Sequence, residues 1–174
     1  MGESGVQEYL ATFECPRNLD VQEFLRRRAI PHEKALKSRT YLVTEAGSIP
    51  EQPTILAYFS LAIHLMEVQG SVSKTLQKRL HGLYFPNNTR PRPLPCFIIG
   101  QIGKDARHSD RTTGSELLDM ARRALLMAND IVGGRFIKID CEDIPALVDL
   151  YQRNGFRAVQ NDVSTGLLEM VLFF

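Results

Sequence analysis

Residues 96–118 read CFIIGQIGKDARHSDRTTGSELL, and this stretch decides the fold class. Its first part, 96–102, is apolar on both alternating faces up to Gln101, which is typical of a strand buried in the middle of a sheet. A polar loop over 104–113 follows. The helix expected next, over 114–129, has a wide apolar stripe formed by Leu117, Leu118, Ala121, Ala124, Leu125 and Ala128. With a strand expected over 135–141, this predicts a right-handed crossover between parallel, neighbouring strands.

Sequence on both sides extends this unit. Residues 40–44 and 54–63 are rich in β-branched and aromatic residues and are separated by the turn-forming AGSIPEQP, so they predict an antiparallel hairpin. A possible helical turn over 75–83 precedes the Pro-rich NNTRPRPLP at 87–95. We interpret this Pro-rich segment as an extended connector, with a polyproline ligand for a partner domain as the alternative.

The ends of the chain supply the remaining elements. We expect a strand over 8–15, a helix from an N-cap at Asp20 to a stop or kink at Pro31, a helix from Pro145 to Gly155, and strands over 156–159 and 167–173. No repeat or low-complexity tract interrupts this order. The fold class is therefore α/β of the mixed α+β kind: one domain over 1–174, with a central twisted mixed sheet flanked by helices on both faces.

Composition excludes several classes of protein. The chain has 174 residues, 44% hydrophobic and 24% charged, as expected for one globular domain. No run approaches the about 18 apolar residues of a membrane span, and the start, MGESGVQEYL, lacks the pattern of a secretory signal. We therefore expect a cytoplasmic protein without membrane contact.

Metal and nucleophile chemistry lack sequence support. Cys15, Cys96 and Cys141 are far apart and odd in number, which favours reduced thiols over disulfides or a metal site. The four histidines form no pair at metal-ligand spacing, and HExxH, GxSxG and GxxxxGK[ST] are absent. We expect no bound metal.

The junction between the buried strand and the helix at Gly114 is a candidate anion site. Free amides and the positive end of a helix dipole attract phosphates, and Arg107 and Arg111 add charge. A pyrophosphate cradle is one interpretation, and a βα junction that binds nothing is the other.

Two further features have both a functional and a structural interpretation. Tyr151, in LYQRNGF, lies one turn before a capping glycine, so it either packs in the core or acts as a general acid. The run 26–39 concentrates six cations, which could hold phosphates or form a solvated helix face. Asp140, Glu142 and Asp143 follow the strand over 135–141, where one of them could steer an amine or relay its proton, although cap and solvent roles also explain them.

The order and spacing of several blocks resemble the GNAT acetyltransferase superfamily, and within it the GNAT toxins of bacterial toxin-antitoxin modules. The resemblance covers nearly the whole chain. Its blocks are FEC, LDVQEFL, SRTYLV, ILAYFSLA, FIIGQIGKD, RTTGSELLDMA and YQRNGF.

This resemblance implies that acetyl-CoA is the cosubstrate. Its pantetheine arm would lie along a strand segment and its pyrophosphate on the following loop. The strand residues are Ile99, Gly100, Gln101, Ile102 and Gly103, and the loop residues are Arg107, Ser109, Asp110, Arg111, Thr112, Thr113, Gly114 and Ser115. Tyr151 matches the family phenol that protonates the departing thiolate.

The sequence departs from the family at the loop. The usual Q/R-x-x-G-x-G/A pattern is represented by Ser109, Thr112 and Gly114, so only the last position is kept, and Gln101 stands where toxin relatives often have arginine. Thr112 adds a side chain where a glycine is usual.

Three functions follow from the resemblance and its departures. The first is acetyl transfer to the α-amine of an aminoacyl-tRNA by a toxin, with an antitoxin partner and a homodimeric state implied. The second is acetyl transfer to a small metabolite or a protein amine. The third is a non-catalytic interaction module with an eroded CoA loop.

Overall fold

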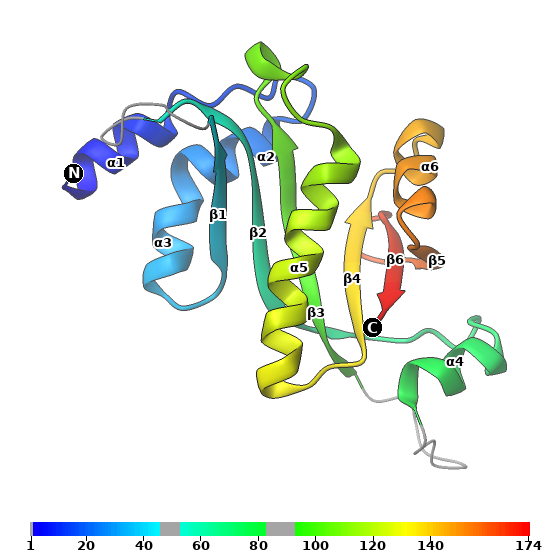
Figure 1. The fold of residues 1–174 in the computed structure, drawn as a ribbon. Coiled ribbons are helices and arrows are strands. Elements are labelled where there is room, and N and C mark those ends of the chain that lie inside the picture. The colour runs from blue at the N-terminus through cyan, green and yellow to red at the C-terminus, as the bar shows by residue number, and fades with distance from the viewer. Residues whose placement is uncertain (1, 46–52, 83–92) are drawn as a thin grey trace. The chain divides into compact units, whose positions relative to one another are not determined.

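The computed structural model describes residues 2–45, 53–82 and 93–174 (Figure 1). Its helices are Glu3–Leu10 (α1), Leu19–Glu23 (α2), Ala29–Lys34 (α3), Lys74–His81 (α4), Gly114–Val132 (α5) and Pro145–Arg153 (α6), with a π turn at Phe24–Arg28 (η1) and a 3₁₀ turn at Ala106–His108 (η2). Its strands are Arg39–Thr44 (β1), Ile55–Met66 (β2), Leu94–Lys104 (β3), Phe136–Cys141 (β4), Arg157–Asn161 (β5) and Leu168–Phe173 (β6).

The six strands form one mixed sheet in the order β1-β2-β3-β4-β6-β5. β1 and β2 pair antiparallel, as predicted for the hairpin. β3 and β4 pair parallel, with Phe97 opposite Ile137, so the crossover prediction is confirmed. β6 pairs antiparallel with both β4 and β5, and the mixed α+β class is confirmed.

Contacts divide the chain into two compact units. The first comprises Met1–Ala62 and Gly100–Ala121, and the second comprises Ile63–Ile99 and Arg122–Phe174. A single domain over 1–174 stays a prediction.

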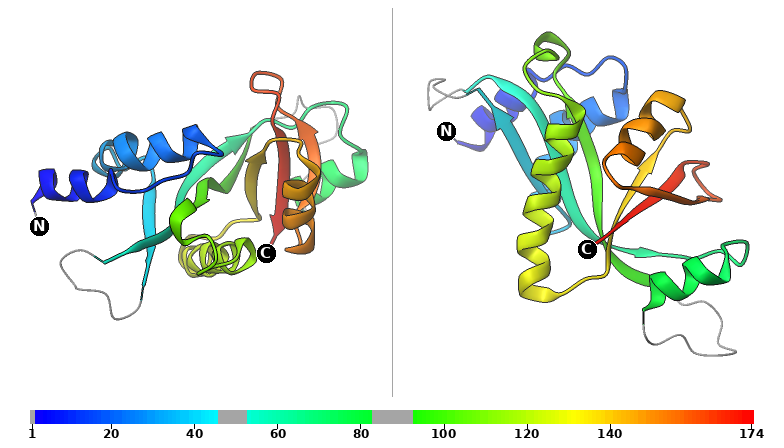
Figure 2. Two further views of the ribbon diagram at one scale, coloured as in Figure 1. Left: turned by 90° about the horizontal axis from the view of Figure 1, so that it is seen from above. Right: turned by 45° about the vertical axis from the view of Figure 1, so that its right-hand side comes forward.

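The first unit has its core where α2, η1 and α3 pack against β2, and Figure 2 shows these helices on one side of the β1–β2 strands. Tyr58 and Phe13 are fully enclosed there, with their rings edge-to-face at 5.2 Å. The hydrophobic effect on this helical face holds the N-terminal segment to the strands.

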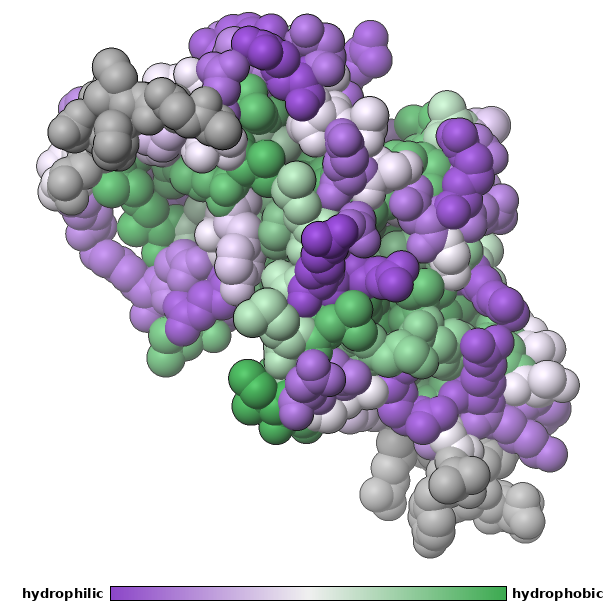
Figure 3. Space-filling model, viewed as in Figure 1, coloured by the Kyte–Doolittle hydropathy of each residue, from purple (hydrophilic) through white to green (hydrophobic). Residues whose placement is uncertain are grey.

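The second unit has its core between α4 and the strands. Its enclosed residues include Met66, Leu80, Phe136 and Val171. Figure 3 shows hydrophobic residues bordered by hydrophilic ones on one face of the molecule. Phe174, at the C-terminus, is 40% exposed.

The prediction of a strand over 8–15 is wrong, because α1 occupies Glu3–Leu10. The apolar positions in this segment fit both the two-residue period of a strand and the 3.6-residue period of a helix. Val6, Tyr9, Leu10 and Phe13 also follow helical spacing, and all four contribute to the core of the first unit, whereas Ala11 is exposed. Burial of the helical stripe decides between the two patterns.

The helix predicted to have its N-cap at Asp20 begins two residues earlier, because Asn18 is its N-cap and accepts a hydrogen bond from the Val21 amide at 3.1 Å. The helical segment does not stop at Pro31, which lies inside α3. Just before it lies the π turn, in which the Ala29 amide donates to Phe24 O, five residues back. Proline lacks an amide hydrogen and its ring displaces the carbonyl four residues earlier, so a wider turn relieves the clash.

Most of the remaining predicted elements are confirmed within one to three residues at each end, including β3 in the interior of the sheet and α4 in place of the weak helical turn over 75–83. The turn AGSIPEQP and the Pro-rich connector fall largely on 46–52 and 83–92, which lie outside the described residues.

Candidate functional site

The glycines at the end of β3 differ in their surroundings. A Cβ added to Gly103 would lie 2.5 Å from Val21 Cγ1, so this glycine is required for close packing of strand and helix within the first unit. A Cβ at Gly100 would meet only Ser60 O, at 4.0 Å. Gln101, which stands where toxin relatives have arginine, donates to Asp20 Oδ2 at 3.0 Å. Gly100 is one of the residues expected to contact the pantetheine arm, and it lies beside open space.

The loop after β3 is held by its own charged groups. Lys104 Nζ donates to Ser109 O at 2.8 Å and to Thr112 O at 3.0 Å. Asp105 has no exposed surface and accepts hydrogen bonds from the backbone and guanidinium of Arg107 and from the Glu14 amide at 3.1 Å. Burial raises the pKa of Asp105, but these hydrogen bonds outweigh burial and hold the pKa below its usual value. The loop conformation is set before any ligand binds.

The start of α5 carries a capping box. The Thr113 amide donates to Glu116 Oε2 at 2.7 Å, and the Glu116 amide donates to Thr113 Oγ1 at 3.2 Å. Hydrogen bonds from Thr113 lower the pKa of Glu116. The helix end predicted to receive a phosphate thus already holds the carboxylate of Glu116, whose negative charge would repel a bound anion.

Both predicted phosphate-binding arginines have carboxylate partners within the first unit. Arg107 Nη2 lies 2.8 Å from Asp105 Oδ2, and Arg111 Nη2 lies 2.8 Å from Glu45 Oε1. Thr112 is buried, whereas Ser109, Asp110 and Ser115 are exposed. The loop residues expected from the sequence come together here, with their cationic groups engaged.

The cationic run over 26–39 is similarly paired. Its ion pairs are Arg27–Glu23, Arg28–Asp20, Lys34–Glu3 and Arg39–Glu33, and Arg26 Nε donates to Phe13 O. Carboxylate partners, most of them within eight residues and one of them 31 residues away, neutralise much of the charge that the run presents.

Tyr151 lies in the second unit, on α6. This helix starts with Pro145 in its first turn, and Gly155, with φ of +89°, follows its C-cap Asn154. Tyr151 is 4% exposed and its ring lies edge-to-face with Phe156 at 5.9 Å. Burial raises the pKa of its phenol. In the described part of the chain, no hydrogen bond engages its hydroxyl, so the phenol is neutral and available as a proton donor.

A buried charge cluster in the second unit was not predicted. Lys138 Nζ lies 2.8 Å from both Asp140 Oδ1 and Glu169 Oε1, and the Lys138 side chain is 3% exposed. Burial lowers the pKa of Lys138, but hydrogen bonds to the two carboxylates raise it above its usual value. The sequence signal was a lysine within the apolar strand FIKIDC, whereas Glu169 is contributed by β6. Of the three acids proposed to steer an amine, Asp140 alone belongs to this cluster.

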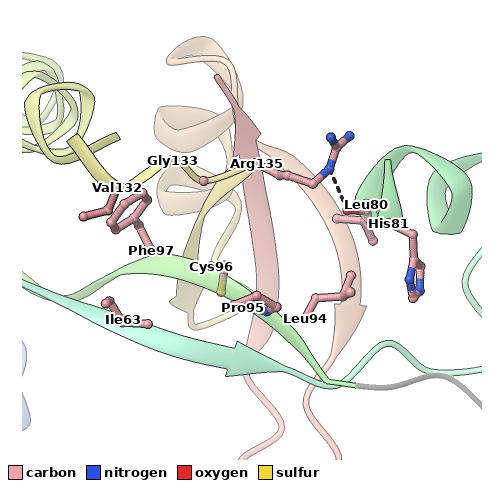
Figure 4. Close-up of a pocket in the computed structure, with 11 residues that line it drawn as sticks. Ile63, Leu80, His81, Leu94, Pro95, Cys96, Phe97, Val132, Gly133 and Arg135 are labelled. Atoms are coloured by element: carbon pink, nitrogen blue, oxygen red, sulfur yellow. Dashed lines mark hydrogen bonds between the residues drawn. The ribbon is translucent and has the colours of Figure 1, made fainter. Parts of the chain in front are cut away.

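A cavity of about 480 Å³ in the second unit was also not predicted (Figure 4). Its walls are mainly apolar and include Leu94, Cys96 and Phe97, and Arg135 Nε at its edge donates to Leu80 O at 3.1 Å. Burial raises the pKa of Cys96 to about 12, so its thiol is a poor nucleophile. All three cysteines are free, as predicted.

Two kinds of feature are absent from the described residues. No helix there combines the length and apolar character needed to cross a membrane. No three His, Cys, Asp or Glu side chains come together there as a metal-binding group.

The arrangement of strands and helices is the GNAT fold. Solved structures with this fold include AtaTR bound with acetyl-CoA (TM-score 0.67, 19% identity, covering 93% of this chain and 86% of that chain). AtaT complexed with acetyl-methionyl-tRNAfMet has a TM-score of 0.69 at 19% identity, covering 95% and 86% of the two chains. A tyrosine-to-phenylalanine mutant of KacT has a TM-score of 0.67 at 20% identity, covering 90% and 84%.

These similarities establish the GNAT fold, as the sequence blocks implied. Another similar structure is a mutant of the toxin AtaT bound to the C-terminus of the antitoxin AtaR. At 20% identity or less, the likeness shows the fold alone. No family model and no curated protein sequence matches the chain.

Proposed function

We propose that this protein is an acetyl-CoA-dependent N-acetyltransferase. The observation that carries the proposal is that Tyr151 on α6 is 4% exposed while no hydrogen bond in the described residues engages its hydroxyl, in a fold whose solved examples include an acetyl-CoA complex. A mutant lacking a tyrosine hydroxyl is among the similar structures. Acetyl transfer from a thioester to an amine needs a proton for the leaving sulfur and no protein nucleophile.

The residues that would hold acetyl-CoA are those of the β3 end and the following loop: 99–103, Arg107 and 109–115. Gly100 beside open space suits a pantetheine arm, and the exposed first turn of α5 suits a pyrophosphate despite Glu116. When bound, acetyl-CoA supplies the activated acetyl group.

The chain's own contribution to chemistry is a proton at Tyr151 Oη. Because burial raises the pKa of this phenol, it is protonated throughout the neutral range and can donate to a thiolate. Asp140, the most exposed member of the buried cluster, is our candidate for attracting the acceptor amine.

For the acceptor we propose the α-amine of an aminoacyl-tRNA, with the protein acting as a translation-blocking toxin in the cytoplasm. Support comes from the AtaT complex with acetyl-methionyl-tRNAfMet and from an AtaT complex with the antitoxin AtaR. An antitoxin partner and a homodimeric state belong to the same proposal.

Two alternatives have specific support. A small metabolite or protein amine is favoured by the neutralised cations of 26–39, which leave less charge for an RNA backbone. A non-catalytic module is favoured by the engaged arginines and by Glu116 at the start of α5.

The test is to offer the protein labelled acetyl-CoA with charged tRNAs, peptides and polyamines. We expect label on the aminoacyl-tRNA and its loss in Tyr151→Phe, with Tyr41→Phe as a control that removes an exposed hydroxyl. Label on peptides or amines alone would replace the toxin proposal. Absence of acetyl-CoA binding by calorimetry at millimolar concentration would reject both enzyme proposals.

A further inference from the structure

A second cavity of the second unit, of about 370 Å³, lies between the end of β2 and the β5–β6 hairpin. Hydrogen bonds between its walls hold it open in a defined form. Gln160 Nε2 donates to Glu67 O at 2.6 Å. The backbone amide of Gln69 donates to Gln160 Oε1 at 2.9 Å, and the side-chain Nε2 of Gln69 donates to Asn161 O at 2.6 Å. The cavity is therefore a built feature of the fold.

The charge of this cavity is one-sided. Among the described residues, its lining includes the carboxylates of Glu67, Asp162 and Glu169 and no lysine or arginine. Asp162 Oδ1 accepts hydrogen bonds from Ser164 and Thr165, which hold the pKa of Asp162 far below its usual value. This carboxylate is ionised at any physiological pH.

The lining residue Glu169 belongs to a buried cluster that is not neutral either. Glu169, 3% exposed, and Asp140 share the single ammonium of Lys138, so two negative charges face one positive charge. An excess charge in a buried environment is costly unless a counter-charge approaches it.

His64 does not provide that counter-charge. Burial, followed by the nearby charge of Lys138, lowers the pKa of His64, so its imidazole is neutral at pH 7. In the described residues no hydrogen bond engages this ring, which leaves an acceptor nitrogen for an ammonium group.

We infer that this cavity binds a small organic cation with two or more primary ammonium groups on an alkyl chain, a linear diamine or polyamine. Ammonium groups match the carboxylates, and Leu65 and Val163 in the lining match methylene groups. The volume is at the lower end of the range for small-molecule sites, roughly 300 to 1,000 Å³. A bare metal ion fits less well, since no metal-binding group occurs in the described residues. The inference concerns binding alone and does not depend on acetyl transfer.

The experiment is calorimetric titration of the full chain with 1,4-diaminobutane and with spermidine, without acetyl-CoA, and with 1,4-butanediol as the uncharged comparison. We expect saturable binding of the amines and none of the diol. Val163 is 88% exposed, so Val163→Arg should fold while placing a guanidinium at the cavity. This variant should lose at least tenfold in amine affinity, whereas the matched Val163→Gln should stay within twofold of the parent.

Two single-charge variants complete the test. Glu67→Gln removes an exposed lining carboxylate and should weaken binding about threefold, whereas Asp130→Asn removes an exposed carboxylate outside the lining and should leave it unchanged. The inference is overturned if the parent shows no binding at millimolar amine, or if Val163→Arg binds as the parent does.

Discussion

Tyr58 in the first unit and Tyr151 in the second are both enclosed by the protein and both lie edge-to-face with a phenylalanine, yet their hydroxyls differ. Tyr58 Oη donates to Val21 O, and its hydroxyl is part of the packing of β2 against α2. No hydrogen bond engages Tyr151 Oη in the described part of the chain. A buried hydroxyl with a protein partner stabilises the fold, whereas one without a partner is available for chemistry.

The charged groups follow the same contrast. In the first unit, Lys104, Asp105 and Glu116 are used in hydrogen bonds that set the loop and the start of α5. In the second unit, the cluster of Lys138, Asp140 and Glu169 retains one unbalanced negative charge. The charges of the first-unit loop are therefore balanced within the protein, whereas those of this second-unit cluster are not.

The largest expected effect is on stability, from Lys138→Met. Removal of the ammonium leaves Glu169 buried without a counter-charge, which should lower the free energy of unfolding by about 3–5 kcal/mol. Urea denaturation at pH 7 measures this loss. Arg122→Met, at an exposed position of the same unit, is the control and should change stability by less than about 0.5 kcal/mol. A Lys138→Met protein as stable as the parent would show that the cluster is not a buried charge pair.

Exchange of the two tyrosines for phenylalanine separates their roles. Tyr151→Phe should reduce the rate of acetyl transfer about 100-fold or more, the usual contribution of a general acid, with little change in stability. Tyr58→Phe should do the reverse, costing about 1–2 kcal/mol of stability because Val21 O loses its donor. Single-turnover rates and thermal unfolding of both variants check the pair. Equal effects of the two substitutions on activity would contradict the contrast.

Asp105→Asn should lower the free energy of unfolding by an amount that depends on pH. Because the folded-state pKa of Asp105 is depressed, its stabilisation is complete well above the ordinary carboxyl pKa of about 4 and is lost as the pH falls through the lower folded value. The difference in unfolding free energy between parent and variant should therefore be larger at pH 7 than at pH 3. Asp110→Asn, at an exposed position of the same loop, should show no such dependence.

The smallest expected effect comes from Glu116→Gln. Glutamine keeps an acceptor for the Thr113 amide but removes the charge at the start of α5, so acetyl-CoA affinity should rise about two- to fivefold. Titration with acetyl-CoA at low ionic strength measures the change, with Glu142→Gln as the exposed control. Unchanged affinity would indicate that the pyrophosphate does not approach this helix end.

Much of the fold could be predicted from local patterns. The parallel β3–β4 pair, the β1–β2 hairpin and α5 follow from hydrophobic period, length and turn residues, which depend on neighbours in the sequence. Residues 8–15 could not be assigned in this way, since their apolar positions satisfy both the strand and the helix period.

The candidate site could be predicted only in part. The loop over 104–113 and Tyr151 were indicated by the resemblance, but the partners of Arg107, Arg111 and the cations of 26–39 were not. Those partners include Glu45 and Glu3, 66 and 31 residues away from the cations they pair with. Pairings over such separations leave no periodic signal in one sequence.

By itself, the sequence determined which segments form helices and strands in most of the chain, because apolar period and turn chemistry act over a few residues. Only the tertiary structure decided which polar groups have a hydrogen-bond or ion-pair partner within the protein and which have none in the described residues. Burial and hydrogen bonding are properties of groups brought together from distant positions, such as Lys138 and Glu169 or Tyr58 and Val21.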